Sequence, residues 1–359
     1  MHTFSPKDNQ ELPLPNEDEY LFGWDPTPGV VSVWANREGQ AIIWQRLGEH
    51  IVSSRERFRP WLFATSLQDF AQLVPRQIHN FDTTGDTSTF TYIELNGPAE
   101  SYHYLISASN GRLLERALVV GASRRLGRQI NSINELEGEY YRVGPVEQFL
   151  MQSGKVYFRG LSYNDLHRLQ FDLETTALDP HRGRIFMAAV RDNRGLATII
   201  EAPTPEDEMR LISNLCALIR ERDPDVIENH NLFGFDLPFL EHRASVAGVP
   251  LILGREGGYQ HLERREESLA IGPEARRRTR YSLAGRELID TLDAVRRHDF
   301  VVRDMPSYSL KDVAKYFGVA SPNRVYFDGA TIFETYLSEP SRVRNYALDD
   351  VVELSLIHI

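Results

Sequence analysis

The sequence has few of the features that indicate a secreted, disulfide-linked or membrane-spanning protein. It contains a single cysteine, Cys216, so no disulfide can form within the chain. It has no run of about 18 apolar residues, and its N-terminus is polar and contains proline, without the basic start and apolar centre of a secretion signal. These absences indicate a cytoplasmic protein without membrane segments, in which we expect Cys216 to be a small buried residue on a helix.

The sequence also contains fewer basic than acidic residues. The 40 Lys and Arg residues are outnumbered by 51 Asp and Glu residues, which gives a net charge of −11. A protein that binds nucleic acid through its whole surface needs clustered Lys and Arg to neutralise phosphates, so the charge argues against that class. A local basic surface remains open, because arginines cluster within residues 276–280, although a solvated loop is the simpler explanation of that cluster.

The features that are present indicate a folded protein with two domains. The 359 residues exceed the roughly 250 to 300 at which single hydrophobic cores stop growing. Short β-branched and aromatic runs in the first part are followed by a segment with helical apolar spacing, and no internal repeat occurs. We expect a loose segment at 1–19, a smaller α+β domain at 20–150 and a second domain at 151–354.

Longer alternations of strands and helices begin at about residue 155. Three strands with short connections suit antiparallel hairpins, and a helix follows at 205–221, opened by Thr204 as N-cap. Next come the strand DVIENH, a helix that ends at Gly248, a polar stretch at 254–280, the strand RELIDT, a helix at 309–317 and a last helix from about 339. This order predicts an RNase H-like α/β fold, with a mixed five-stranded sheet and helices on both faces.

The first strand of this domain carries two carboxylates, in the segment FDLETT. Side chains alternate along a strand, so Asp172 and Glu174 point to one face while Phe171 and Leu173 point into the core. By itself this pair is weak evidence of function, because an exposed edge strand also explains it and Asp-x-Glu arises by chance in an acidic chain.

Two other elements supply acidic groups. Asp236 follows the end of the strand DVIENH, where open α/β sheets bind ligands, although it could simply cap the next helix. On the last helix, Tyr346 and Asp350 are spaced i, i+4 and share a face, although Tyr346 alone suits a core position. Asp349 lies off that face and is expected to be solvated.

Four carboxylates from three elements would repel one another strongly unless cations held them together. No His or Cys cluster accompanies them, so the oxygen ligands favour Mg²⁺ or Mn²⁺. Two such ions about 4 Å apart can clamp the attacking and leaving oxygens of a phosphodiester. The residues therefore predict metal-dependent phosphoryl chemistry.

In order and spacing, the segments FDLETT, NHNLFGFD and YALDD resemble the three exonuclease motifs of family B DNA polymerases, members of the DEDD 3′–5′ exonucleases. The tyrosine version of the third motif is indicated, because the histidine version would need His where this chain has Asn345. The segment RFRPWLFA is similar to the amino-terminal domain that precedes the exonuclease in this family, so the resemblance covers nearly the whole chain.

The resemblance implies a proofreading exonuclease that acts on the single-stranded or frayed 3′ end of DNA. Asp172, Glu174, Asp236 and Asp350 would hold two ions of Mg²⁺ or Mn²⁺, and Tyr346 would orient the attacking water. Contacts with the DNA end are implied for five residues, of which Phe235 and Leu310 could equally be core residues: Thr175, Asn231, Phe235, Ser309 and Leu310.

The family would continue into polymerase domains, which this sequence lacks, and we expect residues 355–359 to be an artificial tail. Two alternatives remain open. One is a stand-alone exonuclease that acts on RNA or repair intermediates. The other is a catalytically inactive module that only binds DNA, although such modules usually lose a carboxylate and all four are present here.

Overall fold

The computed structural model describes residues 25–70, 78–80, 90–255, 262–322, 324–327, 329 and 331–357. The chain divides into two compact units, between Gly160 and Leu161. The expected boundary at residue 150 falls within helix α4 (Pro145–Ser153), whose Phe149 packs into a core of the first unit. The segment expected to be loose, 1–19, lies outside the described residues.

The first unit contains two sheets. One is antiparallel and has the order β1 (Val30–Ala35), β2 (Gln40–Leu47), β3 (His50–Arg57). The other has the order β5-β6-β7-β4-β8, and helix α3 (Gly111–Leu126) packs on it. Its strands are β4 (Trp61–Ala64), β5 (Ile78–Asn80), β6 (Phe90–Glu94), β7 (Tyr104–Ala108) and β8 (Tyr140–Tyr141). The sequence interpretation missed β3, which is largely exposed, and the very short β5 and β8.

The second unit is built on a mixed five-stranded sheet of order β11-β10-β9-β12-β15. Strands β9 (Arg168–Thr175), β10 (Ile185–Asp192) and β11 (Ala197–Glu201) are antiparallel neighbours. Strand β12 (Val226–Asn229) runs parallel to β9 and to β15 (Glu287–Asp290). The predicted RNase H-like sheet is therefore confirmed.

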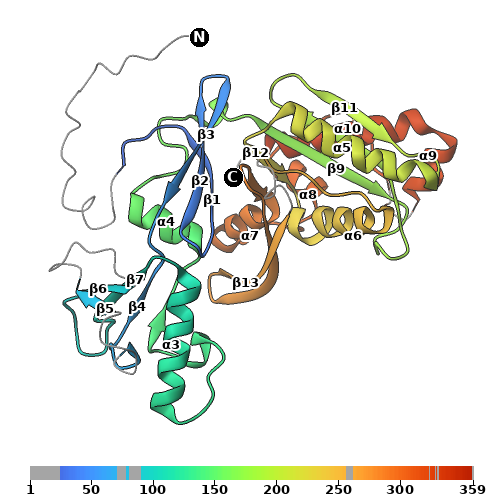
Figure 1. The fold of residues 1–359 in the computed structure, drawn as a ribbon. Helices are drawn as coiled ribbons and strands as arrows, with labels where there is room; N and C mark the ends of the chain where they lie inside the picture. The colour runs from blue at the N-terminus through green and yellow to red at the C-terminus, as the bar shows by residue number, and fades with distance from the viewer. Residues whose placement is uncertain are drawn as a thin grey trace, which may run out of the picture. The chain divides into compact units, whose positions relative to one another are not determined.

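Helices cover both faces of this sheet, as Figure 1 shows for α5 and α10. On one face, α5 (Glu208–Arg222) and α6 (Leu237–Ala247) enclose a core that contains Phe171, Leu215 and the free Cys216. On the other face, α9 (Ile332–Ser338) and α10 (Pro340–Leu356) pack around Phe186 and Ala189. In the part of the chain that the structure describes, no helix is long and apolar enough to cross a membrane.

Several elements of this unit differ from the sequence interpretation. Helix α7 (Thr291–Val302) and α9 were not anticipated, whereas α8 (Leu310–Tyr316) lies where a helix was expected. The polar stretch contains a long hairpin, β13 (Glu263–Ile271) and β14 (Glu274–Ser282), so the arginine cluster lies on a strand. Residues 256–261 of that stretch lie outside the described residues.

The last turn of α10 belongs to the fold. Ile357 is buried with Val295 and Val313, and Ser355 is 3% exposed. Within the tail that was expected to be artificial, Ser355 and Ile357 are therefore buried in the second unit, whereas Leu356 is exposed. Residues 358 and 359 lie outside the described residues.

Candidate active site

Strand β9 separates apolar and acidic side chains onto the two faces of the sheet. Phe171 and Leu173 are buried in the core beneath α5 and α6. Asp172 and Glu174 point to the opposite face, where the paired residues of β10 pack in the core that α10 covers. The alternation of a strand therefore accounts for two acidic groups within a buried segment.

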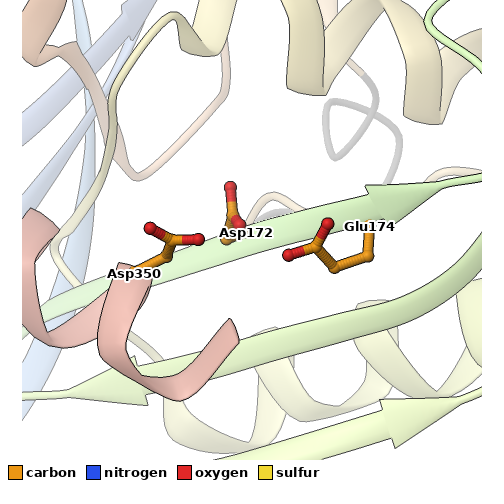
Figure 2. Close-up of side chains that lie close together, drawn as sticks. All are labelled: Asp172, Glu174 and Asp350. Carbon is orange, nitrogen blue, oxygen red and sulfur yellow. The ribbon is translucent and has the colours of Figure 1, made fainter. Parts of the chain in front are cut away.

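The third carboxylate comes from α10. Carboxylate oxygens of Asp172, Glu174 and Asp350 all lie within 4.8 Å of one another. Figure 2 shows the three side chains converging from the strand and the helix. Glu174 and Asp350 are buried, whereas Asp172 is partly exposed. The fold thus brings together three of the four predicted acidic residues.

Burial and mutual repulsion make these acids hard to ionise. Burial raises the pKa of Asp172 to about 7, and the charge of Asp350 adds to the effect. Burial, followed by the charges of Asp172 and Asp350, raises the pKa of Glu174 well above its ordinary value. Burial also raises the pKa of Asp350, against an opposing effect of nearby basic groups. Keeping all three ionised is therefore costly unless cations compensate them.

Asp236 lies close to this group but is not one of the three clustered residues. It ends the short helix η6 (Leu232–Asp236) and is 2% exposed. Burial, followed by the charge of Asp172, raises the pKa of Asp236 well above its usual range, so the two carboxylates interact. Asp236 makes no side-chain capping hydrogen bond to α6, so capping does not explain its position.

The turn that leads to Asp236 is held by Asp290, a residue that the sequence analysis did not single out. Asp290 Oδ1 accepts hydrogen bonds from the backbone N–H of Asn231 at 2.8 Å and of Leu292 at 3.1 Å. Its Oδ2 accepts one from Phe233 at 3.0 Å. An Asp immediately before a helical pattern is a known start signal, and this signal could have identified it.

Tyr346 is both a core residue and a member of the site. Its ring is 6% exposed and packs edge-on against Phe327, with 5.1 Å between ring centroids. Its hydroxyl hydrogen-bonds the carboxylate of Asp350. Burial and the surrounding carboxylates raise the pKa of Tyr346, so the phenol stays protonated at neutral pH.

Two basic residues that the sequence analysis missed balance part of the negative charge. Arg324 forms an ion pair with Asp350, and it lies 3.6 Å from Asp349, which is less solvated than expected. Lys311 Nζ lies 4.8 Å from the centroid of the Tyr346 ring, and its charge opposes the rise in the pKa of Asp172. Neither residue belongs to a motif or to a periodic pattern of the sequence, so the sequence analysis had no reason to single them out.

Two of the residues associated with DNA use their hydroxyl groups locally. The Thr175 hydroxyl donates to the carbonyl oxygen of Ala177 at 3.0 Å. Ser309 caps α8, where its Oγ accepts a hydrogen bond from the N–H of Asp312 at 3.3 Å. Ser309 is exposed, so it remains accessible to solvent while it caps α8.

The other three are partly buried. Phe235 packs against the core beneath α5 and α6, with its ring centroid 5.4 Å from that of Phe239. Leu310 packs against the core beneath α10. Asn231 has a φ of 69°, the left-handed conformation that asparagine tolerates better than most residues. Core packing largely explains why Phe235 and Leu310 occur at their positions. The left-handed turn explains why Asn231 occurs at its position.

The donor atoms fit a hard divalent cation. Glu174 Oε1 and Asp236 Oδ1 are buried without a hydrogen-bond partner, which costs free energy unless a ligand satisfies them. The clustered donors are all carboxylate oxygens, the type that Mg²⁺ and Mn²⁺ prefer. Within the described ranges, this is the one group of three His, Cys, Asp or Glu residues close enough to share an ion.

Comparisons with known proteins agree with this geometry. Residues 164–313 match the model of the exonuclease domain of DNA polymerase family B. DNA polymerase 1 of Pyrococcus abyssi is 29% identical over 326 residues, which cover 86% of this chain and 39% of that protein. DNA polymerase 2 of Aeropyrum pernix is 31% identical over 195 residues, which cover 52% of this chain and 22% of that protein.

A solved structure shows the same fold. The family B DNA polymerase of Pyrobaculum calidifontis aligns with a TM-score of 0.64 and 22% identity, over 91% of this chain and 44% of that one. This chain spans only part of these relatives: it covers 39% of the length of DNA polymerase 1 of Pyrococcus abyssi.

Proposed function

We propose that this chain is the 3′–5′ proofreading exonuclease region of a family B DNA polymerase, because residues 164–313 match the model of the exonuclease domain of that family. It removes the terminal nucleotide from a single-stranded or frayed 3′ end of DNA. The observation that carries the proposal is the meeting of Asp172, Glu174 and Asp350, from β9 and α10, within 4.8 Å. Polymerisation would belong to the rest of the longer protein.

Asp172, Glu174 and Asp350 would hold divalent cations, with Asp236 beside them. Bound Mg²⁺ or Mn²⁺ ions, two in our proposal, would supply positive charge for the phosphate oxygens and lower the pKa of a water. The partnerless buried oxygens of Glu174 and Asp236 support this assignment, because ligands would satisfy them.

Tyr346 would orient the attacking water. Its raised pKa keeps the phenol protonated, so it acts as a hydrogen-bonding group and not as a base. The hydrogen bond to Asp350 fixes the hydroxyl beside the carboxylates. Water oxygen then bonds to the terminal phosphorus while the bond from that phosphorus to the preceding 3′ oxygen breaks, and the preceding nucleotide keeps a 3′ hydroxyl.

Asn231, Phe235, Ser309 and Leu310 would contact the unpaired 3′ end, and Thr175 would contact it through its backbone. The exposed N-terminal end of α8, at Ser309, supports this role most directly. Selection for mispaired ends would follow from geometry, because unpairing costs least at a mismatch.

A 3′-labelled primer with a terminal mispair, incubated with Mg²⁺, tests the proposal. We expect the wild-type chain to shorten the primer from its 3′ end, and the Asp172→Ala, Glu174→Ala double variant to lose activity by at least about a thousandfold. Equal cleavage by both proteins would refute the assignment. A matched RNA primer in the same assay tests the stand-alone RNA exonuclease, which would degrade RNA as fast as DNA.

A further inference from the structure

One guanidinium group lies along the functional face of α10. Tyr346, Asp349, Asp350 and Glu353 are spaced at i, i+3, i+4 and i+7, which places them on one side of the helix. Arg324, which lies outside α10, contacts all four. Three carboxylates on one helix face therefore share a single arginine.

The contacts of Arg324 are close and buried. Its side chain is 1% exposed, and Nη2 pairs with Asp350 Oδ1. Nη1 donates to the backbone oxygen of Tyr346 at 3.0 Å, and the guanidinium carbon lies 4.8 Å from the centroid of the same ring. An arginine cannot lose its proton in a protein, so this positive charge is permanent.

Glu353 lies within ion-pair distance of the guanidinium but does not form a well-aligned hydrogen bond with it. Its Oε1 lies 2.9 Å from Arg324 Nε, yet neither carboxylate oxygen has a partner in hydrogen-bond geometry, although the residue is only 2% exposed. Such a group is costly to bury and would gain from a better-aligned hydrogen bond with the guanidinium. Glu353 therefore offers Arg324 an alternative position beside Asp350.

Arg324 and a divalent cation would compete for the same atom. Asp350 Oδ1 is occupied by the guanidinium, and Asp350 is one of the three carboxylates that could hold an ion. We propose, on the basis of the proposed function, that Arg324 is a positioning residue that holds Asp350 and Tyr346 until the metal binds. It then releases Asp350 and stays paired with Glu353, which makes Glu353 the partner that allows metal loading.

The two partners then have opposite effects on metal affinity. Removing the charge of Arg324 removes the competitor, so Arg324→Gln should bind Mn²⁺ about tenfold more tightly, a change of about 1.4 kcal/mol. Removing the charge of Glu353 leaves Arg324 on Asp350, so Glu353→Gln should bind Mn²⁺ several-fold more weakly. Arg324→Lys keeps the charge and should stay within about twofold of wild type.

The experiment titrates the full chain, without DNA, with Mn²⁺ and follows free Mn²⁺ by electron paramagnetic resonance. Arg243→Gln is the matched control, because Arg243 is a partly buried arginine of α6 that pairs with Glu208 at 2.6 Å, on the opposite face of the sheet. Its Mn²⁺ affinity should equal that of wild type. Circular dichroism establishes that each variant is folded.

Cleavage provides a second readout. At Mn²⁺ concentrations that only partly saturate the wild type, Arg324→Gln should cleave several-fold faster than the wild type, because more of the variant holds the ion. Simple misfolding would weaken both binding and cleavage.

Unchanged Mn²⁺ affinity in Arg324→Gln, or a shift of the same sign in Arg324→Gln and Glu353→Gln, would overturn the inference. If Arg324→Gln does not fold, unchanged affinity in Glu353→Gln overturns it. The outcome is separate from that of the proposed function, because the titration needs no substrate. A chain that binds Mn²⁺ as described but spares a mispaired primer would refute only the function.

Discussion

At the scale of single residues, the site depends on the protonation of buried acids. Burial and neighbouring charge raise the pKa of Asp172 to about 7, and they raise that of Glu174 well above its ordinary value. Tyr346 is pushed in the same direction, which suits a group that must keep its proton. In the folded protein, the ionised form of each of these groups is less favourable than it is in water. Such shifts in pKa are common at functional sites.

Tyr346→Phe separates the hydroxyl from the packing of the ring. Phe keeps the contact with Phe327 but loses the hydrogen bond to Asp350. We expect cleavage to fall by roughly 10- to 100-fold, because the water loses its orientation, while Mn²⁺ affinity stays near that of wild type. Undiminished cleavage in a single-turnover assay would reject the role of the hydroxyl.

The stability of the metal-free protein should fall as pH rises. The folded-state pKa of Asp172 is about 7, above the value of about 3.9 in an unfolded chain. The protonated form is therefore favoured by folding, and its contribution is complete below about pH 4 and is lost as pH rises through 7.

Thermal unfolding in EDTA measures this effect. We expect a higher unfolding temperature at pH 6 than at pH 8, and a smaller difference in Asp172→Asn, which cannot ionise at this position. Added Mn²⁺ should stabilise the wild type more at pH 8 than at pH 6. An equal pH dependence in the wild type and in Asp172→Asn would contradict this account.

At the scale of elements, β9, η6 and α10 place the acidic groups. Strand alternation predicted that Asp172 and Glu174 share a face, and the i, i+4 spacing predicted the same for Tyr346 and Asp350. The sequence could not supply Arg324, because its contacts depend on how a segment outside α10 folds back onto that helix. The hairpin β13–β14 was missed because charged residues fill both strands, where pairs such as Glu267 and Arg278 face each other.

Asp290→Ala tests how η6 is positioned. The substitution leaves three backbone N–H groups, of Asn231, Phe233 and Leu292, without their acceptor. We expect a loss of about 2 to 4 kcal/mol in the free energy of unfolding, together with slower cleavage. Asp290→Asn, which keeps one acceptor oxygen, should lose less. Chemical denaturation measures both variants, and an unchanged midpoint for Asp290→Ala would show that the turn does not need this residue.

At the scale of the whole molecule, the chain divides between Gly160 and Leu161. The composition and the change in element pattern predicted two units, but the boundary was placed within α4, because a short amphipathic helix gives no sign of which unit it packs against. The order of strands predicted the RNase H-like sheet, because few connections fit that alternation of elements. Helix α9 was missed because its seven residues are too few to show a clear helical period.

Residues 161–359 should fold without the first unit, because their two main cores, on either side of the sheet, are formed within that range. We expect the isolated segment to unfold cooperatively and to bind Mn²⁺ as the full chain does. Circular dichroism and a Mn²⁺ titration test this. A non-cooperative transition, or lost Mn²⁺ binding, would show that the second unit depends on the first.

The most direct measurement is the location of Mn²⁺ by anomalous diffraction from crystals grown with that ion. Our account predicts strong peaks bound by the carboxylates of Asp172, Glu174 and Asp350, which would explain why a buried strand and a buried helix carry these charges. Crystals saturated with Mn²⁺ that show no peak at these carboxylates, from a protein that still shortens mispaired primers, would contradict it.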